Sequence, residues 1–93
     1  MISVKFHETV VSLCDEELIG KTFEDAKHCL NISEKYYRGE TMNKKQVLEI
    51  LDNATSINLI GKKVIAIALE RRFINPEGVL IIQGVPHVQI YAR

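Results

Sequence analysis

The segment best suited to binding chemistry is the run Gly84-Val85-Pro86-His87-Val88-Gln89. Glycine permits unusual backbone angles and proline fixes its own φ, so Gly84 and Pro86 can shape a turn. His87 and Gln89 are two positions apart, which places them on one face of a strand. An imidazole that titrates near neutrality beside an amide suits contact with a nucleobase, an amide or a phosphate. The same pattern fits a strand-breaking turn whose histidine satisfies a nearby carbonyl.

Three basic pairs offer a second kind of site. They are Lys44-Lys45, Lys62-Lys63 and Arg71-Arg72, and all fall on the two helices that we expect in the middle of the chain. If those helices run antiparallel, the pairs form a stripe suited to phosphates. The nearby cluster Tyr36-Tyr37-Arg38 is able to stack on bases. The alternative is that the pairs are ordinary solvated helix surface.

Cys14 and His87 are the pair that would make a small enzyme. A nucleophilic thiol needs a lowered pKa, and Cys14 precedes the acidic run Asp15-Glu16-Glu17, which can begin a helical turn. No protease or transferase motif surrounds the cysteine, and a free cysteine is more often a small buried hydrophobe. The acidic run itself is typical of a solvated helix start. The sequence therefore leans against an enzyme.

Neither a metal nor a cofactor is expected. Zinc ligands usually come in pairs at short spacing, and the chain has no C-x-x-C motif. His28 and Cys29 are adjacent, so in a strand they would point to opposite faces. The segment Gly20-Lys21-Thr22 resembles the end of a phosphate-binding loop but lacks its earlier glycine and strand, which argues against nucleotide hydrolysis.

Length and composition predict one globular domain over residues 1–93, with 46% apolar and 26% charged residues and no tryptophan. The net charge is zero but uneven. Residues 1–34 carry seven acidic and three basic side chains, and residues 35–93 carry five acidic and nine basic ones. Such asymmetry can mark a polyanion-binding face. It also lets the two halves attract each other, which we favour because nucleic-acid modules are usually basic overall.

The sequence predicts a cytoplasmic protein that does not enter a membrane. No signal peptide is apparent at the start, and the longest apolar run, Val64 to Leu69, is far shorter than the roughly 18 residues that a membrane span needs. In that compartment Cys14 and Cys29 are expected to stay reduced.

Hydrophobic periodicity predicts the elements. Two long helices are expected, one opened by the capping box Asn43-Lys44-Lys45-Gln46 and one that continues through Gly61. Strands are expected at 2–6, 10–14, 28–32, 79–82 and 88–91, short helical turns at 15–20, 22–25 and 34–37, and long helices over 43–54 and 56–73. The pattern predicts an α+β fold, with a mixed or mostly antiparallel sheet from the N- and C-terminal strands and two central helices packed on one face.

Four blocks in this order, Cys14 to Lys21, Tyr37 to Glu40, Ala54 to Gly61 and Gly84 to Gln89, resemble the archaeal domain of unknown function family 424. The resemblance covers almost the whole chain. It implies a small archaeal cytoplasmic protein associated with RNA or the translation apparatus, and it brings no activity, cofactor or catalytic residue. One departure is the segment 25–29, where the family tends to place a glycine-containing turn.

These observations predict a binding module that contacts RNA or a ribonucleoprotein. The basic helix pairs would act together with the face of His87 and Gln89. One alternative is a small enzyme that uses Cys14 and His87. Another is a protein–protein adaptor or homodimer that pairs through an edge strand at 87–91.

Overall fold

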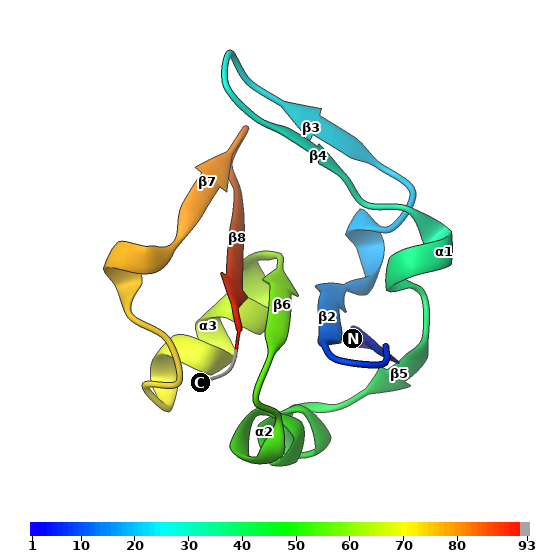
Figure 1. Ribbon diagram of the computed structural model, residues 1–93, viewed down its shortest axis with the longest axis vertical. Helices are drawn as coiled ribbons and strands as arrows, with labels where there is room; N and C mark the ends of the chain where they lie inside the picture. The colour runs from blue at the N-terminus through cyan, green and yellow to red at the C-terminus, as the bar shows by residue number, and fades with distance from the viewer. Residues whose placement is uncertain (92–93) are drawn as a thin grey trace.

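The computed structural model describes residues 1–91 and contains two sheets (Figure 1). The main sheet has six strands in the order β5-β1-β2-β6-β8-β7, and β3 and β4 form a separate hairpin. β2 and β6 pair in parallel, whereas the other strand pairs in the described part of the chain are antiparallel. The strands are β1 (Ile2–Phe6), β2 (Val11–Asp15), β3 (Thr22–Glu24), β4 (Cys29–Asn31), β5 (Glu40–Met42), β6 (Ile57–Ile60), β7 (Leu80–Ile82) and β8 (Val85–Ile90).

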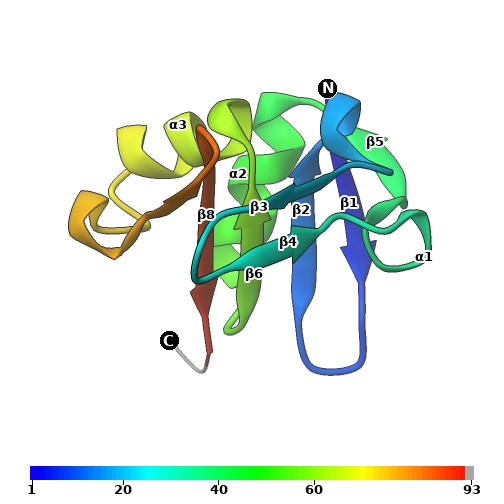
Figure 2. The same cartoon turned by 90° about the horizontal axis from the view of Figure 1, so that it is seen from above.

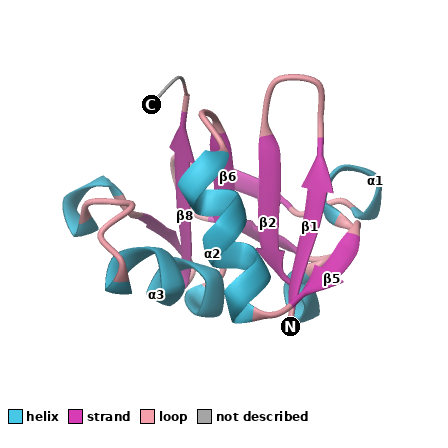
Figure 3. Ribbon diagram, turned by 90° about the horizontal axis from the view of Figure 1, so that it is seen from below, coloured by secondary structure: helices cyan, strands magenta, loops and turns pink. Residues whose placement is uncertain are grey.

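Helices α2 (Lys44–Asn53) and α3 (Lys62–Glu70) cover one face of the main sheet (Figure 3). Every second residue of the central strands points to this side, because side chains alternate across a strand. The resulting core joins both helices to β1, β2, β6 and β8. Its fully buried members are Leu13, Val47, Leu51, Ile57, Leu59, Val64 and Ala68. The α+β class, the mixed sheet and the two helices on one face are thus confirmed.

The β3–β4 hairpin crosses the opposite face of the sheet, beside the single-turn helix α1 (Glu34–Tyr37) (Figure 2). A second apolar cluster lies beneath it, formed by Cys14, Ile19, Leu30, Ile32, Tyr37, Ile60, Ile82 and Val85. Because both faces are covered, β6 is buried at all four positions. This explains why its sequence does not alternate between polar and apolar residues.

The helix predicted over 56–73 is wrong in its first part. Residues 57–60 form the central strand β6, and α3 begins only at Lys62. Gly61 joins them with a φ of 116°, a backbone angle that an L-residue rarely adopts. Ile57, Ile60 and Val64 fit helical spacing, but burial on both faces of the sheet decides the outcome.

Three other local predictions are also corrected. Residues 22–24 form β3 rather than a short helix, because Phe23 pairs with Leu30 and packs on the second cluster. The strand at 80–82, expected to be central, is the edge strand β7, with Ile81 61% exposed. β8, expected at the edge, lies between β6 and β7. The short strand β5 was not predicted.

Several capping predictions are confirmed. The side chain of Asn43 accepts a hydrogen bond from the Gln46 amide and the Gln46 side chain accepts one from the Asn43 amide, which makes the capping box of α2. Ser33 likewise caps α1 by accepting from the Tyr36 amide. None of the helices over residues 1–91 has the length and apolar character of a membrane span.

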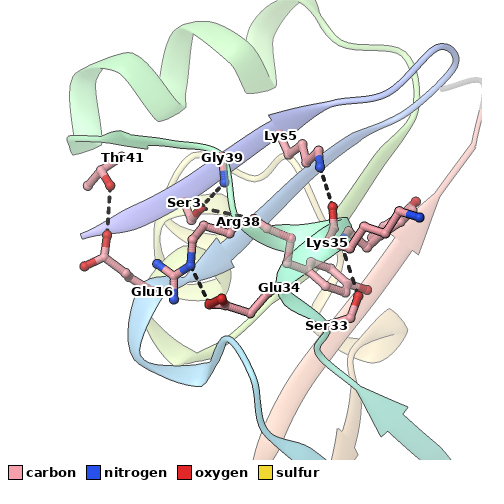
Figure 4. Close-up of polar contacts among 11 residues, drawn as sticks. Ser3, Lys5, Glu16, Ser33, Glu34, Lys35, Arg38, Gly39 and Thr41 are labelled. Carbon is pink, nitrogen blue, oxygen red and sulfur yellow. Dashed lines mark hydrogen bonds and ion pairs between the residues drawn. The ribbon is translucent and has the colours of Figure 1, made fainter.

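Polar contacts fasten α1 and the following segment to β1 (Figure 4). The Ser3 hydroxyl donates to the Tyr37 carbonyl at 3.0 Å and accepts from the Gly39 amide at 2.8 Å. The Lys5 ammonium donates to the carbonyl of Lys35. The chain therefore passes from the hairpin face to β5 along a fixed path.

Candidate functional site

A cleft of about 460 Å³ lies beyond the carboxyl ends of the parallel strands β2 and β6. Ligands commonly bind at this end of parallel strands, because the segments that leave them diverge and create a crevice. The cleft is bounded by the turn after β2, the hairpin strand β3, the start of α3 and the β7–β8 turn. Its lining residues are Asp15, Glu17, Leu18, Lys21, Phe23, Lys62, Lys63, Gln83, Gly84, Val85 and Pro86.

Asp15, in the wall of the cleft, caps helix α3. Its Oδ2 accepts a hydrogen bond from the Lys63 amide at 2.8 Å, and its Oδ1 accepts from the Val64 amide at 2.9 Å. Asp15 is thus a helix cap supplied by a distant strand, rather than the cap of the 15–20 turn that the sequence predicts. Burial raises the pKa of this carboxyl, although the two amide hydrogen bonds lower it.

Lysine side chains surround the cleft from two separate segments. Lys21 follows the 3₁₀ turn Glu16–Leu18, and Lys62 and Lys63 begin α3. The Lys63 ammonium pairs with the Glu17 carboxylate at 3.1 Å. Hydrogen bonds from its own backbone amide and from Lys63 lower the pKa of Glu17, so this carboxylate is charged at neutral pH. Lys21 and Lys62 make no ion pair within residues 1–91.

The remaining wall is apolar and ends in a tight hairpin turn. Leu18, Phe23, Val85 and Pro86 supply its carbon surface. Gln83 and Gly84 both have positive φ, at 49° and 79°, which is the backbone of a two-residue type I′ turn. The Gln83 side-chain oxygen accepts from the Glu24 amide at 3.2 Å and so connects this turn to the hairpin.

The structure divides the predicted binding residues into groups. Gly84, Pro86, Lys62 and Lys63 meet at the cleft, whereas His87 and Gln89 project from the opposite sheet face to the helices. His87 Nε2 lies 2.9 Å from Asn58 Oδ1, and Asn58 Nδ2 donates to the Tyr37 hydroxyl at 3.0 Å. His87 and Gln89 are therefore not among the residues that line the cleft.

The other predicted cations lie away from the cleft. Arg71 and Arg72 follow α3, about 13 Å along the helix from Lys62 at a rise of 1.5 Å per residue. Lys44 pairs with Glu70 at 2.8 Å. Arg38 pairs with Glu34 at 2.6 Å. Lys62 and Lys63 thus lie at the start of α3, and Arg71 and Arg72 lie just beyond its end, where Lys44 pairs with Glu70.

Cys14 and His87 lie on strands separated by β6, with Ile60 as the register partner of both. The thiol is fully buried and donates to the Asp15 carbonyl at 3.2 Å. Burial, together with the charges of Asp15 and Glu17, raises the pKa of Cys14 to about 12. A thiol with this pKa stays protonated at neutral pH, which does not favour its use as a nucleophile.

We expect iodoacetamide at pH 8 to modify Cys29 within minutes and to leave Cys14 unmodified in the folded protein. Cys29 is exposed and Cys14 is buried, and only the thiolate reacts. Intact mass after timed quenching measures the extent of modification. A Cys29→Ser variant should stay unlabelled until denaturant is added. Rapid labelling of that variant would restore Cys14 as a candidate nucleophile.

Sequence reasoning missed several residues of the cleft. It draws attention to Lys21 only as part of an incomplete phosphate loop, and it gives Phe23 no role. Asp15 and Gly61 lie far apart in the sequence. Nothing in their spacing indicates that the Asp15 carboxylate caps the helix that follows Gly61. Over residues 1–91, no three histidine, cysteine or carboxylate side chains gather as they would around a metal ion.

Comparisons with known proteins agree with this fold. A crystal structure of an uncharacterized conserved protein from Methanopyrus kandleri is similar over 99% of this chain and 90% of that one, with a TM-score of 0.68 and 27% identity. No curated protein matches the sequence. The sequence family described as "Protein of unknown function (DUF424)" matches residues 3–92. The chain belongs to this family.

Proposed function

We propose that this protein is a binding module that contacts RNA, free or in a ribonucleoprotein, and that the cleft holds a single-stranded segment. The observation that carries the proposal is the meeting of Lys21, Lys62 and Lys63 around an apolar wall that contains Phe23. Single-strand binding proteins combine cations that follow the phosphates with an aromatic ring on which a base stacks. The cleft volume also lies within the usual range for a bound nucleotide-sized group.

The charges of the cleft support a polyanionic ligand despite its two carboxylates. Asp15 already accepts two amide hydrogen bonds, and Glu17 is paired with Lys63. Among the described residues, this leaves Lys21 and Lys62 as the rim cations that are exposed and without an ion pair. Because the first amides of α3 are occupied by Asp15, the lysine side chains must supply the phosphate contacts.

The test measures binding of a fluorescein-labelled ten-nucleotide single-stranded RNA by anisotropy at several salt concentrations. Changing Lys21 and Lys62 together to alanine should weaken binding about tenfold at low salt. It should also reduce the slope of log affinity against log salt by roughly 1.4, because each phosphate contact in a single strand contributes about 0.7. Changing Phe23 to alanine should weaken binding about 5- to 100-fold without altering the slope.

Two control variants separate the cleft from general charge. Lys45→Ala removes an exposed lysine of α2 outside the cleft, and it should change affinity less than twofold. The double change Arg71→Ala and Arg72→Ala tests the helix stripe. A loss of affinity in this variant with none in the Lys21 and Lys62 variant would reject the cleft. Absence of salt-dependent RNA binding would reject the function itself.

A further inference from the structure

A patch of polar and aromatic side chains lies on the sheet face that carries the β3–β4 hairpin. We call it the sheet-face patch and define it by Tyr36, His87, Gln89 and Tyr91, with Asn58 beneath. The hairpin crosses only one half of that face, and among residues 1–91 no strand lies over the half where β6 begins and β8 ends (Figure 2). Gln89 is the register partner of Asn58 in the neighbouring strand.

Hydrogen bonds fix the orientation of the polar groups. Asn58 is buried, and its side chain joins His87 to the Tyr37 hydroxyl. Burial lowers the pKa of His87, so its imidazole is neutral at pH 7. Since an amide oxygen only accepts, the His87 Nε2 carries the proton and Nδ1 is an acceptor. Over residues 1–91, this Nδ1 has no hydrogen-bond partner.

Two further polar groups next to Asn58 lack intramolecular partners within the described residues. The Gln89 side chain is exposed and makes no hydrogen bond there, so its amide offers one acceptor and two donors. The Ser12 Oγ is completely buried without a partner, and Ser12 is the register partner of Asn58 in β2. Buried polar groups are normally satisfied, so the Ser12 hydroxyl is an exception beside Asn58.

Aromatic rings connect to these groups through Tyr37, whose hydroxyl accepts a hydrogen bond from Asn58. Tyr36 stacks on His7 with a centroid separation of 4.0 Å and an interplanar angle of 17°, and it meets the edge of Tyr37 at 4.9 Å. Tyr91 is 64% exposed. The pKa of Tyr37 is raised chiefly by burial and further by the charges of Tyr36, Cys14 and Tyr91, although the hydrogen bond from Asn58 lowers it.

We infer that the sheet-face patch reads one unpaired nucleobase, a proposal that rests on the proposed function for its ligand. The base stacks on Tyr36 or Tyr91, and its polar edge pairs with the Gln89 amide and the His87 Nδ1. Phosphate contacts bind RNA regardless of sequence, whereas contacts to base edges provide sequence preference. The cleft supplies the first kind of contact and the sheet-face patch supplies the second.

Tyrosine fluorescence is a direct probe of this patch. The chain has no tryptophan, and its three tyrosines are Tyr36, Tyr37 and Tyr91. Titration with single-base RNA hexamers should quench this emission, and one hexamer should bind at least fivefold more tightly than the others. Gln89→Ala should lower affinity for the preferred hexamer about tenfold and remove the preference. Because Gln89 is exposed, its replacement leaves the fold intact, which circular dichroism checks.

The matched comparison is the variant with Lys21 and Lys62 changed to alanine, which should weaken all hexamers equally and keep the preference. If RNA binds but the hexamers are equivalent, or if Gln89→Ala leaves the preference unchanged, the base-reading role is wrong and the proposed function stands. If no hexamer quenches tyrosine emission and none binds by anisotropy, both proposals are overturned.

Discussion

Replacing Gly61 by alanine is expected to lower the free energy of unfolding by about 3–5 kcal/mol, which is a large part of the stability of a domain of this size. Two effects add. A φ of 116° costs an L-residue about 1–3 kcal/mol, and forcing a methyl group into a filled space costs a similar amount. The new Cβ would overlap the carboxyl group of Asp15, the cap of α3. Urea unfolding followed by circular dichroism measures the change.

Gly84→Ala separates the two effects, because Gly84 also has a positive φ, 79°, but has open space around it. This variant should lose only about 1–2 kcal/mol, the cost of a left-handed L-residue. Asp15→Ala should lose about 0.5–2 kcal/mol through the missing cap. Gly61→Ala made in the Asp15→Ala background should cost clearly less than in the wild type, since the overlap is gone. Strict additivity would show that Asp15 and Gly61 do not conflict.

Gly39→Ala is expected to lower the free energy of unfolding by about 2–4 kcal/mol, for a different reason. Gly39 packs against β1, where an added Cβ would overlap the Val4 carbonyl oxygen and lie 3.0 Å from the Lys5 Cα. These are backbone atoms, so no side-chain rotation relieves the contact. Moving the two segments apart would cost about 1–3 kcal/mol by overpacking and about 1 kcal/mol for the Gly39 hydrogen bond to Ser3 (Figure 4).

Gly78→Ala is the matched control for this position. Gly78 has no atom within 4 Å of an added Cβ, and its φ lies in the range that ordinary residues adopt. The substitution should leave stability unchanged or raise it by up to about 1 kcal/mol, because alanine reduces the entropy of the unfolded chain. If urea unfolding shows that the Gly39→Ala and Gly78→Ala variants lose the same free energy of unfolding, the close approach of Gly39 to β1 does not contribute to stability.

Sequence patterns within a few residues predict the helix caps and the alternation of single strands, because these features depend on neighbouring residues alone. The capping box at Asn43 and the Ser33 cap depend on hydrogen bonds within four residues, and both are visible in the sequence. The alternation of Ile2 and Val4 with polar residues is likewise a property of one strand. At Phe6, the last residue of β1, the pattern wrongly indicates burial, because this side chain is 61% exposed.

The errors arose where tertiary packing overrides local preference. Residues 57–60 share a helical spacing with residues 64–68, but they become a strand because the sheet offers burial on both faces. Residues 80–82 are uniformly apolar like a central strand, yet they form an edge. The cleft was only half predicted, because its walls come from segments as distant as Phe23 and Pro86. Their meeting depends on sheet order, which no local pattern encodes.

The Asp15 cap has a consequence for selectivity. The start of an uncapped helix attracts small inorganic anions through its free amides, but here the protein's own carboxylate already occupies that position. The remaining cationic groups are flexible, strongly hydrated ammonium ions, each of which holds a lone phosphate weakly. Tight binding then requires several phosphate contacts made at once. A polymer favours this, because after its first phosphate binds, the linked phosphates are held at a high effective concentration near the other lysines. Under the proposed function, the cleft is therefore expected to bind free phosphate weakly and longer single strands more tightly.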